Sequence, residues 1–258
     1  MLPRLAPPCR LAPPCRLAPR CLLTPPCRRT IVTASEIDRE ALEREAIRLC
    51  RRYIEEIVLP FDLCPWAAPA LRQQRVEIVA LSEPVATPGP PLMEAARRGA
   101  ATLDACSQRP DLELVLVLYP RFTLARTGFD ALLRELRDHH RPPHFVMAAF
   151  HPEASADTAN AERLIPFLRR SPDPMVQGVR KDVLDRIEPG RGTGTAFVSL
   201  DRFLAGDLVA PLNPSPRERV AEANLETVRR VGIHELERAL TAIHDDRRRT
   251  YAALGVRT

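Results

Sequence analysis

The chain has 258 residues, of which 45% are hydrophobic, and it carries a formal net charge of +5. This length is enough to bury a sizeable core, and the hydrophobic content is ordinary for a globular protein in water. No apolar stretch approaches the ~18 residues that a membrane-spanning helix needs, so we expect no membrane span.

The first thirty residues repeat a proline-rich hexapeptide, in the order LAPPCR, LAPPCR, LAPRCL and LTPPCR from Leu5 to Arg28. They contain six arginines and no acidic residue, so they carry +6 and leave −1 for the rest of the chain. Such a proline content is incompatible with helix or sheet. We therefore predict a disordered tail over residues 1–33. Because the excess positive charge lies there, the folded part gives no indication of nucleic-acid binding.

Seven cysteines occur in the chain, but four of them belong to the repeat. The other three, Cys50, Cys64 and Cys106, form no CxxC pair and are odd in number, which predicts reduced thiols in the cytoplasm. Cys50 and Cys106 lie on apolar stripes of predicted helices and are interpreted as small buried hydrophobes. Cys64 lies in the irregular stretch 61–69, outside any stripe.

The periodicity of apolar residues predicts a helix over 35–58, followed by strands that alternate with helices. Strands are expected at 75–81, 112–118 and 144–150, and helices at 91–107 and 128–139. The strands at 112–118 and 144–150 are continuous apolar runs, which is typical of strands buried on both faces. This β-α-β-α-β order predicts a small, mostly parallel sheet with right-handed crossovers.

Helices dominate the predicted remainder of the chain. A short helix is expected at 161–168, and Asp173 followed by Pro174 has the pattern of an N-cap and first helical residue for a helix over 173–187. Two further helices are predicted at about 215–231 and onward to about 254. We therefore expect a single α/β domain over residues 34–258, with the sheet flanked by helices and with helices at both ends.

Two predicted strands end alike, in Leu118-Tyr119-Pro120 and in Phe150-His151-Pro152. Proline stops a strand because it cannot donate to the ladder. Tyr119 and His151 would then lie at the carboxyl ends of neighbouring parallel strands, which is where ligands bind in open α/β sheets. The alternative is that both are ordinary strand-end residues.

A second candidate feature is the segment Arg169-Arg170-Ser171-Pro172-Asp173-Pro174. Guanidinium groups suit carboxylates and phosphates, and the start of the predicted helix at 174 would add free backbone N–H groups. On that helix Gln177 and Arg180 would share a face with Asp173. We therefore predict an anion site formed by these residues. The alternative is a structural network of ion pairs. Arg75, at the start of the first strand, is a weaker candidate because it would lie at the opposite end of the sheet.

The ordered landmarks of the chain resemble those of DUF1415, a bacterial family of unknown function. The similar segments are LCPWA (63–67), Pro120, AFHP (149–152), IPFLRRSPDP (165–174) with Gln177 and Arg180, and NLETVRRVG (224–232). The resemblance covers roughly residues 36–240 and implies that the tail lies outside the domain. Trp66 and Tyr119 depart from the family pattern, in which Phe and His are expected. The family label implies no activity.

Three functional hypotheses follow from these residues. The first is an enzyme or ligand-processing domain for a small anionic molecule that bears phosphate or carboxylate, with His151 as general acid or base and Cys64 as nucleophile. The second is a non-catalytic module that senses an anion or docks a protein. The third is a haem or metal carrier that uses Cys64 and His151. The sequence identifies no cofactor and no resident metal site, and it gives no oligomeric state.

Overall fold

The computed structural model describes residues 34–64, 67–154, 159–187 and 216–256. The predicted tail (1–33) and Trp66 lie outside the described residues. Residues 34–258 form one compact unit with a mixed α/β fold, as the sequence predicts. No helix in the described part of the chain is long and apolar enough to cross a membrane.

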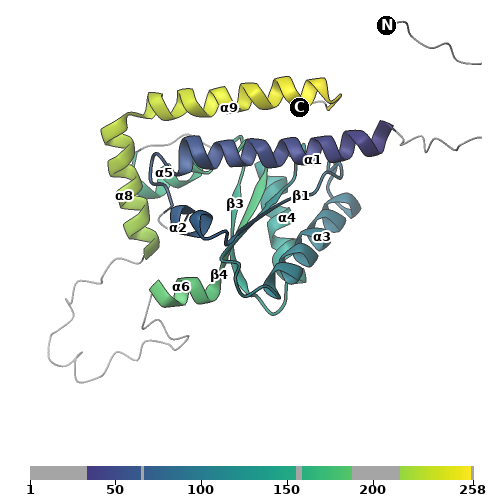
Figure 1. Ribbon diagram of the computed structural model, residues 1–258, viewed down its shortest axis with the longest axis horizontal. Coiled ribbons are helices and arrows are strands. Elements are labelled where there is room, and N and C mark those ends of the chain that lie inside the picture. Colours follow the sequence, from purple (N-terminus) through teal and green to yellow (C-terminus); the bar gives the residue numbers. More distant parts are fainter. Residues whose placement is uncertain (1–33, 65–66, 155–158, 188–215, 257–258) are drawn as a thin grey trace, which may run out of the picture. The chain divides into compact units, whose positions relative to one another are not determined.

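The elements follow the predicted order closely over most of the chain (Figure 1). The first helix, α1 (Ala34–Tyr53), continues without a break into a short π-helix, η1 (Ile54–Val58). The remaining elements are α2 (Ala67–Arg72), β1 (Val76–Ala80), α3 (Pro90–Ser107), β2 (Leu114–Leu118), α4 (Arg126–His139), β3 (Phe145–Phe150), α5 (Ala161–Leu168), β4 (Met175–Arg180), α6 (Lys181–Ile187), α8 (Pro216–Val231) and α9 (Ile233–Ala253).

The predicted helix over 173–187 is wrong. Residues Met175–Arg180 form strand β4, and only Lys181–Ile187 are helical. The valines of this segment fit a helical stripe and a strand equally well, so periodicity alone did not decide between them. Valine and glycine disfavour a helix, and the strand gains hydrogen bonds to neighbours on both sides. Asp173 therefore caps no helix.

The sheet has the order β1-β2-β4-β3. Strands β1 and β2 are parallel, as predicted, but β4 runs antiparallel to both β2 and β3. The predicted mostly parallel sheet is thus wrong, although the three predicted strands do run in one direction. Because β4 lies between β2 and β3, Tyr119 and His151 do not follow neighbouring strands.

One face of the sheet is fully covered by α3 and α4. These helices pack against each other and against inward side chains of the strands, such as Val115, Val117 and Val176. Leu103, Phe129 and Leu136 are completely buried in this layer. This side of the sheet contains a closed core.

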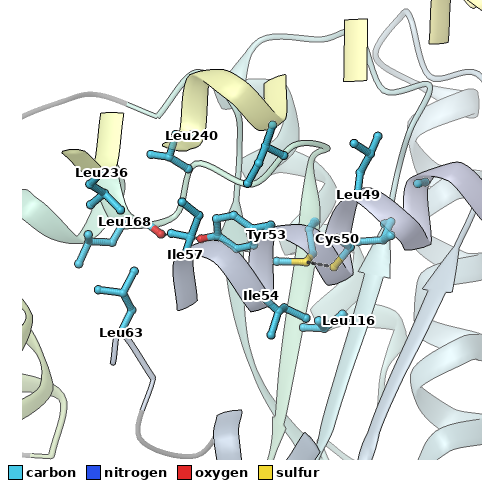
Figure 2. Packing of buried hydrophobic residues seen from close by; sticks show 14 of the residues in the cluster. Leu49, Cys50, Tyr53, Ile54, Ile57, Leu63, Leu116, Leu168, Leu236 and Leu240 are labelled. Atoms are coloured by element: carbon cyan, nitrogen blue, oxygen red, sulfur yellow. Dashed lines mark hydrogen bonds between the residues drawn. The ribbon is translucent and has the colours of Figure 1, made fainter. Parts of the chain in front are cut away.

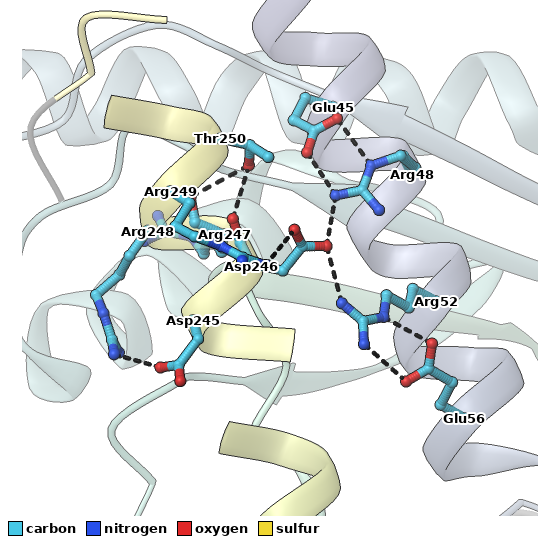
Figure 3. A network of polar contacts seen from close by, with 10 residues as sticks. All are labelled: Glu45, Arg48, Arg52, Glu56, Asp245, Asp246, Arg247, Arg248, Arg249 and Thr250. Carbon is cyan, nitrogen blue, oxygen red and sulfur yellow. Dashed lines mark hydrogen bonds and ion pairs between the residues drawn. The ribbon is translucent and has the colours of Figure 1, made fainter. Parts of the chain in front are cut away.

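One end of the other face is covered by α1 and α9, which lie side by side in Figure 1. Figure 2 shows the core between them and the sheet, where the Tyr53 hydroxyl donates to the Leu168 carbonyl at 2.7 Å. On the surface of this pair, Asp246 of α9 accepts hydrogen bonds from Arg48 and Arg52 of α1 at 2.7 and 2.8 Å (Figure 3). These contacts fix the two helices over one end of the sheet face.

Candidate functional site

A cavity of about 760 Å³ opens over the face of the sheet that carries α1 and α9, and it extends round the free edge of β3 to Met147, Ala149 and α4. Registers between strands place twelve side chains on this face, in three rows of four: Val76, Leu114, Val179 and Val146; Ile78, Leu116, Gln177 and Ala148; Ala80, Leu118, Met175 and Phe150. Nine of the twelve line the cavity, all but Ile78, Ala80 and Leu118. Among the twelve, Gln177 is the single polar residue. The floor of the cavity is thus apolar, with one carboxamide near its centre.

Gln177 lies on a strand that is paired on both sides, with Leu116 and Ala148 as its neighbours across the sheet. Its carboxamide makes no hydrogen bond within the described part of the chain. The side chain is partly exposed in the cavity, so a polar group from solvent or from a ligand can reach its carboxamide. The predicted inclusion of Gln177 in a site therefore agrees with its position in this cavity.

The walls of the cavity come from several elements. η1 contributes Ile54 and Val58, and Cys64 lies in the wall between η1 and α2, half-buried. Asn224 of α8 donates to the Leu63 carbonyl at 3.3 Å, which holds α8 against the same segment. The π-helical turn lies directly at the wall, and π-turns inside α-helices are frequent at functional sites.

Charged groups around the cavity are mostly basic. Among its described lining residues there are four basic side chains and one acidic side chain, namely Arg126, Arg137, Arg169, Lys181 and Asp130. Arg137 donates to the Met147 carbonyl on the free edge of β3 at 2.8 Å. Arg169 lies over the Phe150 ring, with 5.5 Å from the guanidinium carbon to the ring centroid. The cavity therefore combines an apolar floor with a positive rim.

A second, small cavity of about 30 Å³ lies beside the first. Its lining residues are Arg126, Phe129, Asp130, Ala149, His151, Ala154, Ile165, Pro166 and Arg169. Five of them also line the large cavity, namely Arg126, Asp130, Ala149, Ile165 and Arg169. His151 is 5% exposed, and burial is the main reason that its pKa is lowered. Cys64 and His151 thus line different cavities.

Arg180 does not belong to either cavity. Since it lies on a strand, three residues after Gln177, its side chain points to the opposite face. Its guanidinium is buried and donates to the carbonyls of Leu112 and Arg109 at 2.6 Å each and of Cys106 at 3.2 Å. A cation at the end of α3 also complements the helix dipole. The predicted shared face of Gln177 and Arg180 is wrong, and Arg180 is a structural cap.

Asp173 is also engaged within the fold. Its carboxylate is 1% exposed, and it accepts from Arg247 Nε and from the Tyr251 hydroxyl of α9, both at 2.7 Å. The Ser171 hydroxyl donates to the Asp173 carbonyl at 2.5 Å. The Ser-Pro-Asp-Pro turn therefore fastens the C-terminal helix to the sheet. For these residues the structural alternative agrees with the geometry, and no helix start adds to an anion site there.

The two arginines before this turn have different surroundings. Arg170 Nε donates to the Ala154 carbonyl at 2.7 Å, and its guanidinium lies 5.0 Å from the centroid of the Phe167 ring. Arg169 lines both cavities. Of the predicted arginine corner, Arg169 is thus the member placed at the candidate site.

The remaining predicted residues lie apart from the cavities. Tyr119 is 1% exposed in the core beneath α3 and α4, and its hydroxyl has no hydrogen-bond partner within the described part of the chain. Arg75 forms an ion pair with Glu113 at 2.7 Å near the start of β1. The described residues contain no group of three or more His, Cys, Asp or Glu side chains that could hold a metal ion.

The family described as "Protein of unknown function (DUF1415)" matches residues 45–189, which is more than half of the chain. The chain belongs to the DUF1415 family. No curated protein and no solved structure matches it. The DUF1415 match spans all four strands and most of the cavity lining, whereas the part of the lining contributed by α8 lies beyond it.

Sequence reasoning missed five polar residues that line the two cavities, namely Arg126, Asp130, Arg137, Lys181 and Asn224. Arg126 begins α4, Lys181 begins α6, and Asn224 lies on α8. Lys181 carried a usable signal, because it is the single lysine in an arginine-rich chain. Arg126 and Asn224 carried none, since each reads as an ordinary residue of an amphipathic helix.

Proposed function

We propose that this DUF1415 chain binds a small molecule that combines an apolar body with one acidic group. The observation that carries the proposal is the large cavity, whose floor is apolar except for Gln177 and whose rim has four basic groups against one acidic group among the described lining residues. Its volume lies in the range of about 300–1,000 Å³ that is usual for pockets holding small molecules.

Each part of the cavity has a complementary part in such a ligand. The floor would cover a hydrocarbon chain or ring, the Gln177 carboxamide would accept from or donate to a polar atom in the middle, and the basic rim would attract the acidic group. A polyanion such as a nucleotide has too little apolar surface for this floor. The anionic ligand predicted from the sequence is thus kept, and its site moves from the Arg169–Pro174 corner to the sheet face.

Binding is the activity that the placement of Cys64 and His151 supports best. A nucleophile needs its base within about 3 Å, but these two residues line different cavities. The same separation argues against the carrier hypothesis, which needs both residues on one metal or haem. Chemistry on the bound molecule remains open to Cys64, which lies in the wall of the large cavity.

We also propose a cytoplasmic location and no nucleic-acid partner. The three cysteines outside the tail form no disulfide, which is usual in a reducing compartment. The charge of −1 outside the tail gives no support to nucleic-acid binding.

The proposal is tested by titrating octanoate, octan-1-ol and octyl phosphate into the full chain by calorimetry. Burial of each methylene contributes ~0.8 kcal/mol, so an octyl chain supplies up to about 5 kcal/mol and dissociation constants near 1 mM or below are expected. The blocking variant is Ala148→Phe, which fills the floor beside Gln177.

Ala148→Phe should weaken binding of every octyl compound by about tenfold or more, because the added ring takes the place of the chain. The matched control is Ala101→Phe, the same change at an exposed position of α3. If no octyl compound binds, or if both variants bind as the unmodified chain does, the proposed function is wrong.

A further inference from the structure

His151 presents a buried donor with no acceptor. The side chain is 5% exposed, and its Nδ1 accepts from the Glu153 backbone N–H at 3.2 Å. In the neutral ring the proton must then lie on Nε2. That Nε2 has no hydrogen-bond partner within the described part of the chain. The Leu124 carbonyl lies close enough to favour the charged ring, but it makes no hydrogen bond of normal geometry.

Charges of both signs surround His151, because Glu153 and Asp130 raise its pKa whereas Arg126 lowers it. Arg126 and Arg169 line the same small cavity, and Asp130 is its one acidic lining residue among those described. Arg126 is the first residue of α4, and the N-cap residue Ala125 offers no side-chain hydrogen bond to the helix start. The Gly128 N–H donates to the Ala125 carbonyl at 2.8 Å, so in the first turn of α4 the N–H groups of Arg126 and Thr127 remain at the positive end of the helix dipole. Within the described part of the chain, no group accepts a hydrogen bond from His151 Nε2.

The size of the cavity limits which acceptor fits. A buried water needs roughly 10–15 Å³ of cavity volume. The small cavity, at about 30 Å³, therefore holds about two waters. The two oxygens of a carboxylate replace two waters, whereas a phosphate monoester brings three free oxygens and a larger central atom. The volume therefore favours a carboxylate.

The small cavity also continues the large one around the free edge of β3. The two share five lining residues, among them Ala149 of β3 and Arg169. The backbone groups of this strand alternate in direction. Lys181 N–H reaches the His144 carbonyl toward β4, whereas Met147 and His151 use their outward groups for Arg137 and Arg169. Ala149 lies between Met147 and His151 in the chain, so its N–H faces the same outer edge of β3 and adds a donor.

We propose that the ligand of this chain is an apolar carboxylic acid whose carboxylate enters the small cavity and accepts from His151 Nε2–H. Its hydrocarbon body then passes the edge of β3 and lies over the floor beside Gln177. This inference rests on the proposed function and narrows its acidic group from carboxylate or phosphate to carboxylate. His151 acts as a binding residue that recognises the head group.

The test compares the dissociation constants of octanoate, octan-1-ol and octyl phosphate for the full chain and its variants. A hydrogen bond to a charged group is worth about tenfold or more in affinity, so octanoate should bind at least about tenfold more tightly than octan-1-ol. His151→Phe should abolish this preference, so that octanoate no longer binds more tightly than octan-1-ol. His151→Gln keeps an amide donor near the position of Nε2 and should retain part of the preference.

Two further variants keep the test decisive. His234→Phe makes the same change at a side chain that is 90% exposed and should change nothing. Arg126→Met removes one of the two guanidiniums and should reduce the preference for octanoate without a change in the fold, which carries the test if His151→Phe fails to fold.

The possible outcomes separate the two proposals. If octanoate and octan-1-ol bind equally and Ala148→Phe weakens both, the proposed binding over the apolar floor is supported and the proposed carboxylate subsite at His151 is wrong. The subsite is also wrong if octyl phosphate binds more tightly than octanoate, or if His151→Phe and Arg126→Met both keep the preference. If none of the three compounds binds, the proposed function itself fails.

Discussion

At the scale of one residue, Gln177 is the reason to interpret the sheet face beneath the large cavity as a binding site. Eleven of the twelve side chains on this face are apolar, and a fully apolar face would pack better against covering helices. A carboxamide near the middle of such a face has no stabilising role within the described part of the chain, because it makes no hydrogen bond there. Its polarity is explained if the face binds a molecule with a polar atom.

The three thiols outside the tail should differ sharply in reactivity. Burial raises the pKa of Cys50 to about 12, and burial also raises the pKa of Cys106. Cys64 is half-buried in the wall of the large cavity. Because the thiolate is the reactive form, iodoacetamide should modify Cys64 before the other two at pH 7.5. Mass spectrometry of peptides separates these sites from the four cysteines of the tail.

The same experiment reports on occupancy of the cavity. Octanoate at ten times its dissociation constant should slow the modification of Cys64 by about tenfold, since the bound chain covers the wall in that fraction of molecules. Modification of a tail cysteine such as Cys9 is the internal control and should keep its rate. Modification of Cys50 at the rate of Cys64 would contradict the assigned burial.

Single residues of the site were predictable only where one local pattern decided their environment. The apolar stripes correctly separated the buried Cys50 and Cys106 from Cys64. The charge of Arg180 suggested a ligand, but its donors are used by backbone carbonyls that lie about seventy residues earlier in the chain. No local pattern reports such a long-range partner, so sequence reasoning could not tell a structural arginine from a binding one.

At the scale of elements, β4 marks the limit of the prediction. The other strands and the helices α1, α3, α4, α5, α8 and α9 were predicted within a few residues, because their periodicity fits one element only. Helix α2 was not predicted, since it begins in the stretch 61–69 that was expected to be irregular. The periodicity of Met175–Arg180 fits both a helix and a strand. The insertion of this segment as a strand between β2 and β3 depends on pairing with those strands rather than on its own sequence. The error moved Gln177 and Arg180 onto one face and created a helix start that does not exist.

The packing of α3 on α4 and β2 offers a test at this scale. A Cβ added at Gly99 of α3 would lie 2.2 Å from the Tyr119 hydroxyl oxygen. Gly99→Ala should therefore destabilise the fold by roughly 1–3 kcal/mol, as overpacking does. Tyr119→Phe should be neutral or stabilising by up to about 1 kcal/mol, because it removes a buried hydroxyl that has no partner within the described part of the chain.

The double variant Gly99→Ala with Tyr119→Phe should recover part of the lost stability, since the added methyl then meets no hydroxyl but still lies 2.8 Å from Leu136 Cδ1. Urea denaturation of the four proteins gives the coupling between the two positions. Additive effects, or a large loss in Tyr119→Phe alone, would show that the hydroxyl has a role in the fold or a partner in solution.

At the scale of the whole compact unit, the two faces of the sheet are covered unequally. α3 and α4 close one face, whereas α1 and α9 cover only one end of the other and leave the large cavity over the rest. The Asp173 contacts with Arg247 and Tyr251 hold α9 at that end. The cavity therefore exists because the second helical layer is incomplete among the described residues. Sequence patterns within single helices and strands do not predict how completely helices cover a sheet.

The most direct measurement of the central claim is a methyl NMR titration of the full chain with octanoate. Leu116 of β2 and Val179 of β4 line the floor of the cavity, whereas Val115 and Val117 of β2 point to the closed core. We predict saturable shifts of the Leu116 and Val179 methyls and unchanged Val115 and Val117 methyls. Shifts confined to the closed face, or no shift at any octanoate concentration, would contradict the account.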